Sequence, residues 1–130
     1  MSFIYFALWY GSALTALLTT DPRVLDAVCH VESHGNPTAI SSEHCRGQYQ
    51  INPRYTPLPK WALHVPAFSR AESARHIAAW RKKTHGDTMR ALAAYNCGNV
   101  ALVSDCGQGY AHKVINLAHK GVRPCPSLLP

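Results

Sequence analysis

Acidic side chains are scarce in this chain of 130 residues, where seven Asp and Glu stand against thirteen Lys and Arg and the formal net charge is +6. A basic protein is attracted to polyanions, which include nucleic acid, anionic lipid and the anionic bacterial wall. The densest basic cluster, Arg81-Lys82-Lys83, has no interleaved aromatic residues and is typical of a helix C-terminus. We therefore expect no nucleic-acid partner.

The sequence also lacks the paired Cys-x-x-Cys spacing of a structural zinc site. Disulfides in an oxidising compartment are the better interpretation for a short chain with five cysteines, which stand at positions 29, 45, 97, 106 and 125. Cys97 and Cys106 would close a short loop. A bridge between Cys29 and Cys45 would leave Cys125 over, but the sequence alone leaves the pairing open.

The His-Glu-x-x-His order of a zinc protease is absent as well. His30 and His34 lie on either side of Glu32, and on a helix the Glu32 side chain would point away from both imidazoles. We therefore expect neither a metal site nor another cofactor.

No Lys or Arg precedes the uncharged apolar run from Phe3 to Thr20. A secretory signal normally has a basic start and a small-x-small cleavage site, and Ala13 to Ala16 is a poor one. About 18 residues reach the lower limit for crossing a bilayer. Residues 1–20 are thus either a membrane or export segment or a buried first helix, and both interpretations stay open.

Residues 21–121 read as one mainly α-helical domain, because apolar residues recur at helical spacing between cap signals. Asp21 and Pro22 start one helix, which Gly35 and Pro37 end. Ser69 with Glu72 forms a capping box for the next helix. Asp87 or Thr88 opens a further helix, and a last one runs from near Tyr110 to Gly121.

The remaining segments are predicted to be irregular. Gln48 to Asn52 alternates and reads as a short strand or extended segment. Four prolines predict a loop from Pro53 to Pro66. The Pro-rich tail, residues 122–130, is either disordered or docked on another surface.

Several short motifs follow one another in a fixed order along the domain. They are Glu32-Ser33, Asn36-Pro37, Ala39-Ile40-Ser41, Gly47 with Gln50-Ile51, Ala94-Tyr95-Asn96 with Gly98, and Tyr110. In this order, over about Asp21 to Lys120, the chain resembles the lytic transglycosylases of the goose-type lysozyme superfamily, which cut the glycan strands of bacterial peptidoglycan. The resemblance implies a lysozyme-like helical domain with an active-site cleft.

The resemblance also implies roles for single residues. Glu32 would be the catalytic acid and base, and burial at a helix end would raise its pKa. Ser33 and Gln50 would bind the sugar or orient the acid, Tyr95 and Asn96 would line the cleft, and Tyr110 would hydrogen-bond the Glu32 carboxyl. Gln48 and Tyr49 depart from the usual leucine and methionine, and we expect them to alter how the sugar ring is seated.

Trp61 and Tyr55 would either stack on sugars or stabilise their loop. A second carboxylate at Glu43 would instead favour a hydrolytic muramidase, and a non-catalytic glycan-binding or structural protein is a rival from another class. The expected partner is the peptidoglycan glycan strand, in the periplasm or on a virion or cell exterior. Residues 1–20 or the tail would tether the domain to a membrane, a phage virion or an envelope-spanning assembly.

Overall fold

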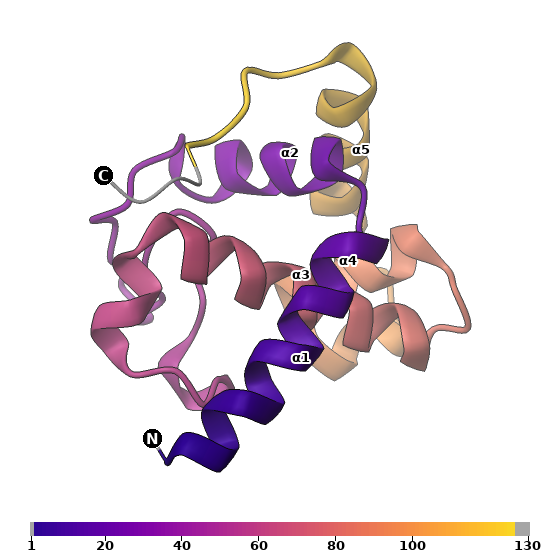
Figure 1. Ribbon diagram of the computed structural model, residues 1–130. Coiled ribbons are helices and arrows are strands. Elements are labelled where there is room, and N and C mark those ends of the chain that lie inside the picture. Colours follow the sequence, from indigo (N-terminus) through magenta and orange to yellow (C-terminus); the bar gives the residue numbers. More distant parts are fainter. Residues whose placement is uncertain (1, 127–130) are drawn as a thin grey trace.

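The computed structural model describes residues 2–126 and is mainly helical, as the sequence predicts (Figure 1). The described residues form no β-strand, only isolated bridges that join Arg46 to Ile40 and to Ile51. The elements in chain order are α1 (Phe3–Thr19), α2 (Pro22–Ser33), η1 (Pro53–Tyr55), η2 (Lys60–His64), α3 (Pro66–Lys83), α4 (Thr88–Cys97), η3 (Gly98–Leu102) and α5 (Gln108–Lys120).

Helix α3 is the centre of the arrangement, since α1 packs on one side of it and α4 on another. Helix α5 packs against both α4 and α2. Two predicted helix starts are confirmed: Asp21 accepts a hydrogen bond from the backbone N–H of Arg23, and Asp87 accepts one from that of Arg90. Both carboxylates satisfy amide groups that lack an intrahelical partner, which stabilises the first turn.

The predicted capping box at Ser69 is wrong. Helix α3 begins three residues earlier, at Pro66, because proline fixes the backbone angle that a first helical residue needs. Ser69 and Glu72 therefore lie within α3 rather than at its start. Both side chains are buried in the protein. The Glu72 carboxylate accepts hydrogen bonds from the indole N–H of Trp9 and from Arg75, so it joins α1 to α3.

Two irregular segments are more ordered than predicted. The Pro53 to Pro66 stretch contains the short helices η1 and η2, because proline is tolerated in the first turn of a helix. Gln48 to Asn52 is a tight turn rather than a strand, and Gln50 there has a positive φ of 52°. Gly47 is required before it, since a Cβ on Gly47 would lie 1.9 Å from the Leu63 carbonyl oxygen.

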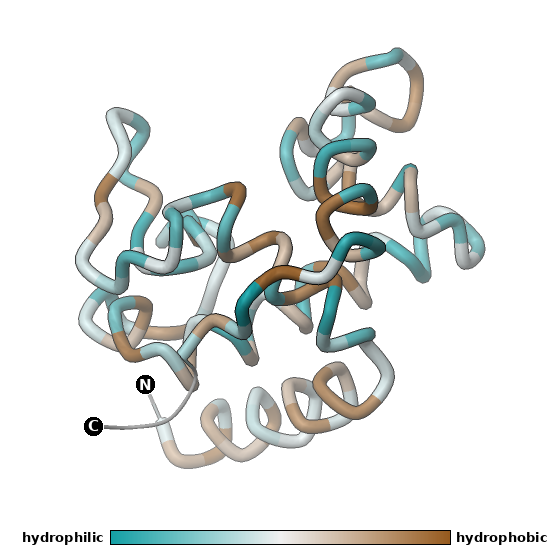
Figure 2. Tube along the Cα trace, turned by 90° about the horizontal axis from the view of Figure 1, so that it is seen from above, coloured by the Kyte–Doolittle hydropathy of each residue, from teal (hydrophilic) through white to brown (hydrophobic). Residues whose placement is uncertain are grey.

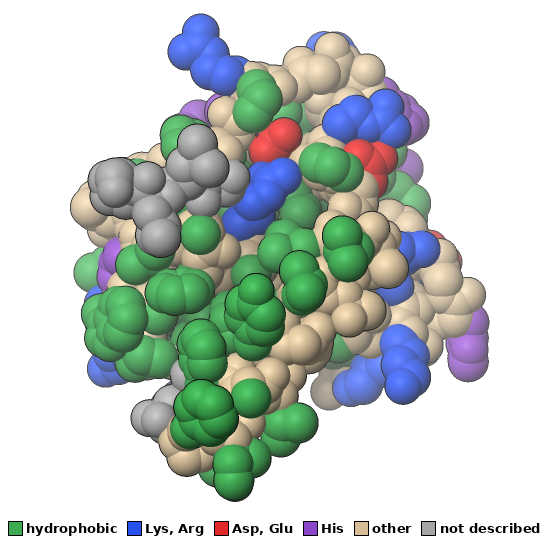
Figure 3. Space-filling view, in the orientation of Figure 1, with side chains coloured by type: hydrophobic (Ala, Val, Ile, Leu, Met, Phe, Trp, Pro, Cys, Tyr) green, Lys and Arg blue, Asp and Glu red, His purple; other side chains and the backbone are tan. Residues whose placement is uncertain are grey.

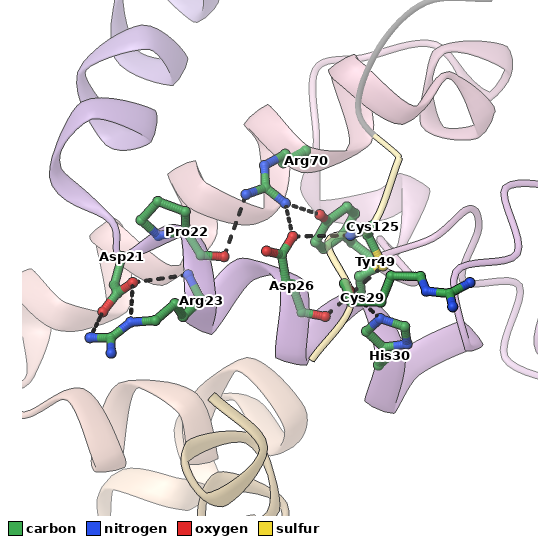
Figure 4. Close-up of polar contacts among 10 residues, drawn as sticks. Asp21, Pro22, Arg23, Asp26, Cys29, His30, Tyr49, Arg70 and Cys125 are labelled. Atoms are coloured by element: carbon green, nitrogen blue, oxygen red, sulfur yellow. Dashed lines mark hydrogen bonds and ion pairs between the residues drawn. A yellow bond between two sulfur atoms is a disulfide. The ribbon is translucent and has the colours of Figure 1, made fainter. Parts of the chain in front are cut away.

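The cysteine pairing differs from the bridge considered between Cys29 and Cys45. Cys29 is bonded to Cys125, and Cys97 to Cys106, which leaves Cys45 free. The chain after α5 crosses back over α2, where the Cys125 N–H donates to the Asp26 carboxylate (Figure 4). The tail is thus docked through Cys125, while residues 127–130 lie outside the described residues.

Helix α1 is packed against α3 on one side only, through Trp9, Ala13 and Ala16. It runs along one edge of the molecule and has no strongly hydrophilic stretch (Figure 2). Apolar side chains gather over α1 in Figure 3. The exposed apolar residues of this helix include Phe3 at 85% and Leu18 at 79% exposed. Within residues 2–126 no single helix is long and apolar enough to cross a membrane; α1 and α2 together are, but they are bent by 105°.

Candidate active site

A cleft of about 740 Å³ runs between α2, α3, α4 and the turn that follows α2. It brings together four of the six residues that the sequence predicts for the site, namely Glu32, Gln50, Tyr95 and Asn96. Tyr110 lies directly behind Glu32, and Ser33 points elsewhere.

Glu32 occupies the last turn of α2 and is only partly exposed to the cleft. Burial raises the pKa of its carboxyl to about 7, and the hydrogen bond from Tyr110 partly opposes this rise. The carbonyl groups at a helix C-terminus also disfavour a negative charge nearby. Glu32 is therefore a carboxylic acid that both holds and releases a proton near neutral pH.

Tyr110 fixes the orientation of this carboxyl. Its hydroxyl donates to Glu32 Oε2 at 2.9 Å, a contact between residues 78 positions apart in the chain. The Tyr110 ring stacks on that of Tyr95, with ring centroids 6.4 Å apart. Tyr95 in turn donates to the Tyr49 carbonyl at 2.8 Å and lies 3.0 Å from Ser73 Oγ. The acid is thus supported by two rings that are themselves held by the core.

Gln50 lines the cleft with its amide group already oriented. Its NH₂ donates to the carbonyl oxygens of Gly47 at 3.0 Å and Ala39 at 3.3 Å. Both amide hydrogens are used in these bonds, so the side-chain oxygen is the part of this amide available to accept a further hydrogen bond. Asn96, at the end of α4, is exposed in the cleft.

Ser33 does not line the cleft. Its hydroxyl lies 2.8 Å from the Gln48 carbonyl, to which it donates, and it accepts from the Asn36 N–H at 3.1 Å. These bonds hold the turn after α2 against the turn that carries Gln50. We therefore propose that Ser33 positions the site rather than touches a ligand.

The two departures from the family pattern point into the protein rather than into the cleft. Gln48 is 1% exposed and donates to the Gly35 carbonyl, and the Tyr49 hydroxyl accepts from Arg70 at 2.8 Å. The expectation that they alter the seating of a ligand therefore finds no support in their placement. Of the two loop aromatics, Tyr55 lines the cleft, whereas Trp61 packs on Phe68.

Sequence reasoning missed the wall that α3 contributes. The residues of this wall are Arg75, His76, Ala79, Trp80 and Lys83. Their spacing of one, three, one and three positions places them on one face of a helix, which was the available signal. Glu43 is exposed on the turn after α2 and lines the same cleft as Glu32. Within residues 2–126 no three His, Cys, Asp or Glu side chains are grouped as metal ligands would be.

Replacing Tyr110 by phenylalanine should raise the pKa of Glu32 further above 7, because the lost hydroxyl stabilises the charged form. A ¹³C NMR titration of the Glu32 carboxyl measures this directly. Tyr55→Phe is the control, since Tyr55 lines the cleft without a hydrogen bond to Glu32. A pKa that stays unchanged or falls in Tyr110→Phe would contradict the assigned role.

The raised pKa of Glu32 also determines how its contribution to folding stability changes with pH. The Glu32 pKa of about 7 in the folded state lies above its ordinary value of 4.5, so folded protein binds the proton more tightly. The contribution of Glu32 to folding stability is therefore full below pH 4.5 and decreases as the pH rises through 7.

Comparison with known protein families gives a match over most of the chain. The family model described as the transglycosylase SLT domain matches residues 15–117. No curated protein and no solved structure matches the chain significantly. The match covers α2 to η3 in full and most of α5, and it includes only the end of α1.

Proposed function

Because the chain belongs to the transglycosylase SLT domain family, we propose that it is a lytic transglycosylase that cuts peptidoglycan between N-acetylmuramic acid and N-acetylglucosamine. The observation that carries this proposal is the partly buried Glu32 carboxyl, with its pKa near 7, at the wall of an open cleft. Such a group suits general acid and base work at neutral pH.

In the proposed reaction, Glu32 first donates its proton to the oxygen of the β-1,4 bond, and the N-acetylglucosamine side leaves as an alcohol. The Glu32 carboxylate then removes the proton from the 6-hydroxyl of the muramic ring, and that oxygen bonds to the anomeric carbon. A 1,6-anhydro sugar forms and no water is consumed. Glu32 ends protonated again, so a single carboxyl completes the cycle.

The neighbouring side chains support this reaction without a second acid. The substrate's own acetamido group would stabilise the positive charge at the anomeric carbon, and Asn96, which lines the cleft, would contact that group. The free oxygen of Gln50 would accept a hydrogen bond from a sugar hydroxyl. Tyr110 would keep the Glu32 carboxyl in one orientation through both proton transfers.

Mass spectrometry of the fragments released from purified peptidoglycan tests the proposal. Anhydromuropeptides are the expected products. Release of reducing-end sugars would instead identify a hydrolytic muramidase, the second candidate, which is favoured by one observation: Glu43 is exposed and lines the same cleft as Glu32. A carboxylate there would activate a water molecule, as in the two-carboxylate scheme. No release of either kind would favour a binding or structural role.

The family and the disulfides support a proposal for the place of action. Enzymes of this family act on the cell wall, and two disulfides suit an oxidising compartment. We propose a periplasmic or extracellular enzyme held at a lipid bilayer by the outer face of α1. Helix α3 covers one side of α1, and the large apolar side chains exposed on the rest of α1 form the kind of surface that marks an interaction site.

Flotation with phospholipid vesicles tests this tether. The wild type should float, whereas a Leu8→Glu, Leu18→Glu double variant should lose at least about ten-fold in partitioning, because two exposed apolar contacts become charged. Val103→Glu is the matched control, since Val103 is an exposed apolar residue outside α1. Wild-type protein that stays with the soluble fraction would contradict the tether and favour a phage or envelope protein as the partner of α1.

A further inference from the structure

The α3 wall of the cleft, defined above by Arg75, His76, Ala79, Trp80 and Lys83, carries cations that the proposed reaction does not use. The proposed reaction depends on Glu32 and assigns no role to the residues of this wall. Two aromatic contacts connect Tyr110, which supports Glu32, to α3. Tyr110 stacks on Tyr95, and the Tyr95 ring packs edge-on against the His76 ring, with ring centroids 6.4 Å apart.

Two side chains of the wall, Arg75 and His76, are already held from behind by Glu72. Glu72 is fully buried, and its Oε1 accepts from Arg75 Nε at 2.7 Å and lies 3.0 Å from His76 Nε2. Burial alone would raise the pKa of Glu72, yet the hydrogen bonds from His76 and Arg75 lower it to about 2. Glu72 is thus a permanent anion that fixes these two side chains on the wall.

Lys83 is the cation of this wall that remains available. Within residues 2–126 no carboxylate forms an ion pair with it, and its ammonium group lies 4.9 Å from the centroid of the Trp80 ring. It is exposed, and it follows His76 by seven positions, or roughly 10 Å along the helix. Lys83 therefore lies at the end of the wall, about two helical turns from His76, and lines the same cleft as Glu32.

We propose that Lys83 and Trp80 form a binding site for a carboxylate of the peptide stem that N-acetylmuramic acid carries, so that the enzyme prefers strands with charged stems. This inference rests on the proposed function. The glycan itself is neutral, since its lactyl group is amide-bonded to the stem, and the anionic groups of an intact strand are on the peptide. An ammonium group on a flexible stem binds such a carboxylate as a point charge, and the Trp80 ring offers an apolar surface beside it.

The test compares intact peptidoglycan strands with strands whose peptide carboxylates have been converted to amides, which alters charge and little else. The wild type should show a kcat/KM about five-fold higher on intact strands, the range of one exposed ion pair. Lys83→Gln should cut both substrates at the rate that the wild type shows on amidated strands, through a higher KM at unchanged kcat. Added salt should reduce the wild-type preference.

Lys82→Gln is the matched control, because Lys82 is the adjacent cation of the same helix and faces the groove between α1 and α3 instead. It should retain the wild-type preference. Equal rates of the wild type on both substrates, or the same loss in Lys82→Gln as in Lys83→Gln, would overturn the inference while leaving the proposed function intact. A wild type that cleaves neither substrate would refute the proposed function and the inference with it.

Discussion

Glu32→Gln should abolish the release of anhydromuropeptides, with a fall in kcat of about 10²- to 10⁴-fold, the usual contribution of a positioned acid and base. The fall belongs at the upper end, because one carboxyl is proposed to perform both proton transfers. Glutamine has nearly the same shape, and its amide oxygen still accepts the Tyr110 hydroxyl. Loss of activity in this variant therefore reflects the missing proton rather than a displaced side chain.

Glu43→Gln is the control for that experiment, since Glu43 is the other carboxylate of the cleft. It should leave the yield of anhydro products within about two-fold of the wild type. Circular dichroism and thermal melting should show both variants folded. Full anhydro release by Glu32→Gln would remove Glu32 from the mechanism. Loss of products in Glu43→Gln, combined with reducing ends in the wild type, would establish the hydrolytic candidate.

Removing the bridge between Cys29 and Cys125 should destabilise the protein more than any other single covalent change. It joins positions 96 apart, so its loss frees a very large loop in the unfolded chain. In the chain-entropy model this corresponds to about 4 to 5 kcal/mol of unfolding free energy. Cys125→Ser is the preferred variant, because the thiol left at Cys29 is a small, tolerated core group.

The second bridge provides the comparison. Cys97 and Cys106 are 9 positions apart, so a Cys97→Ser, Cys106→Ser variant should lose only about 2 to 3 kcal/mol. Cys45→Ser should be close to neutral, because Cys45 is free. Urea unfolding followed by tryptophan fluorescence measures all three. A smaller loss in Cys125→Ser than in the double variant would show that the tail is not held as the structure has it.

Features that depend on residues close together in the sequence were predicted correctly, whereas features that depend on distant residues were not. The caps at Asp21 and Asp87 depend on groups within three residues and were predicted correctly. The bridge of Cys29 depends on the path of the tail after Gly121, which no local pattern encodes. Glu72 was misread as a cap, since its partner Trp9 lies 63 positions away. Recognition of the α3 wall required knowing which face of α3 borders the cleft.

The hydrogen bond from Trp9 to Glu72 connects α1 to the α3 wall of the cleft. Glu72 holds Arg75 and His76 on the α3 wall, and the indole N–H of Trp9 on α1 donates to the other oxygen of the same carboxylate. A protease that trimmed the first twenty residues would admit solvent to Glu72 and loosen that wall. Helix α1 therefore supports the α3 wall, and removing it should weaken ligand binding in the cleft before the fold is lost.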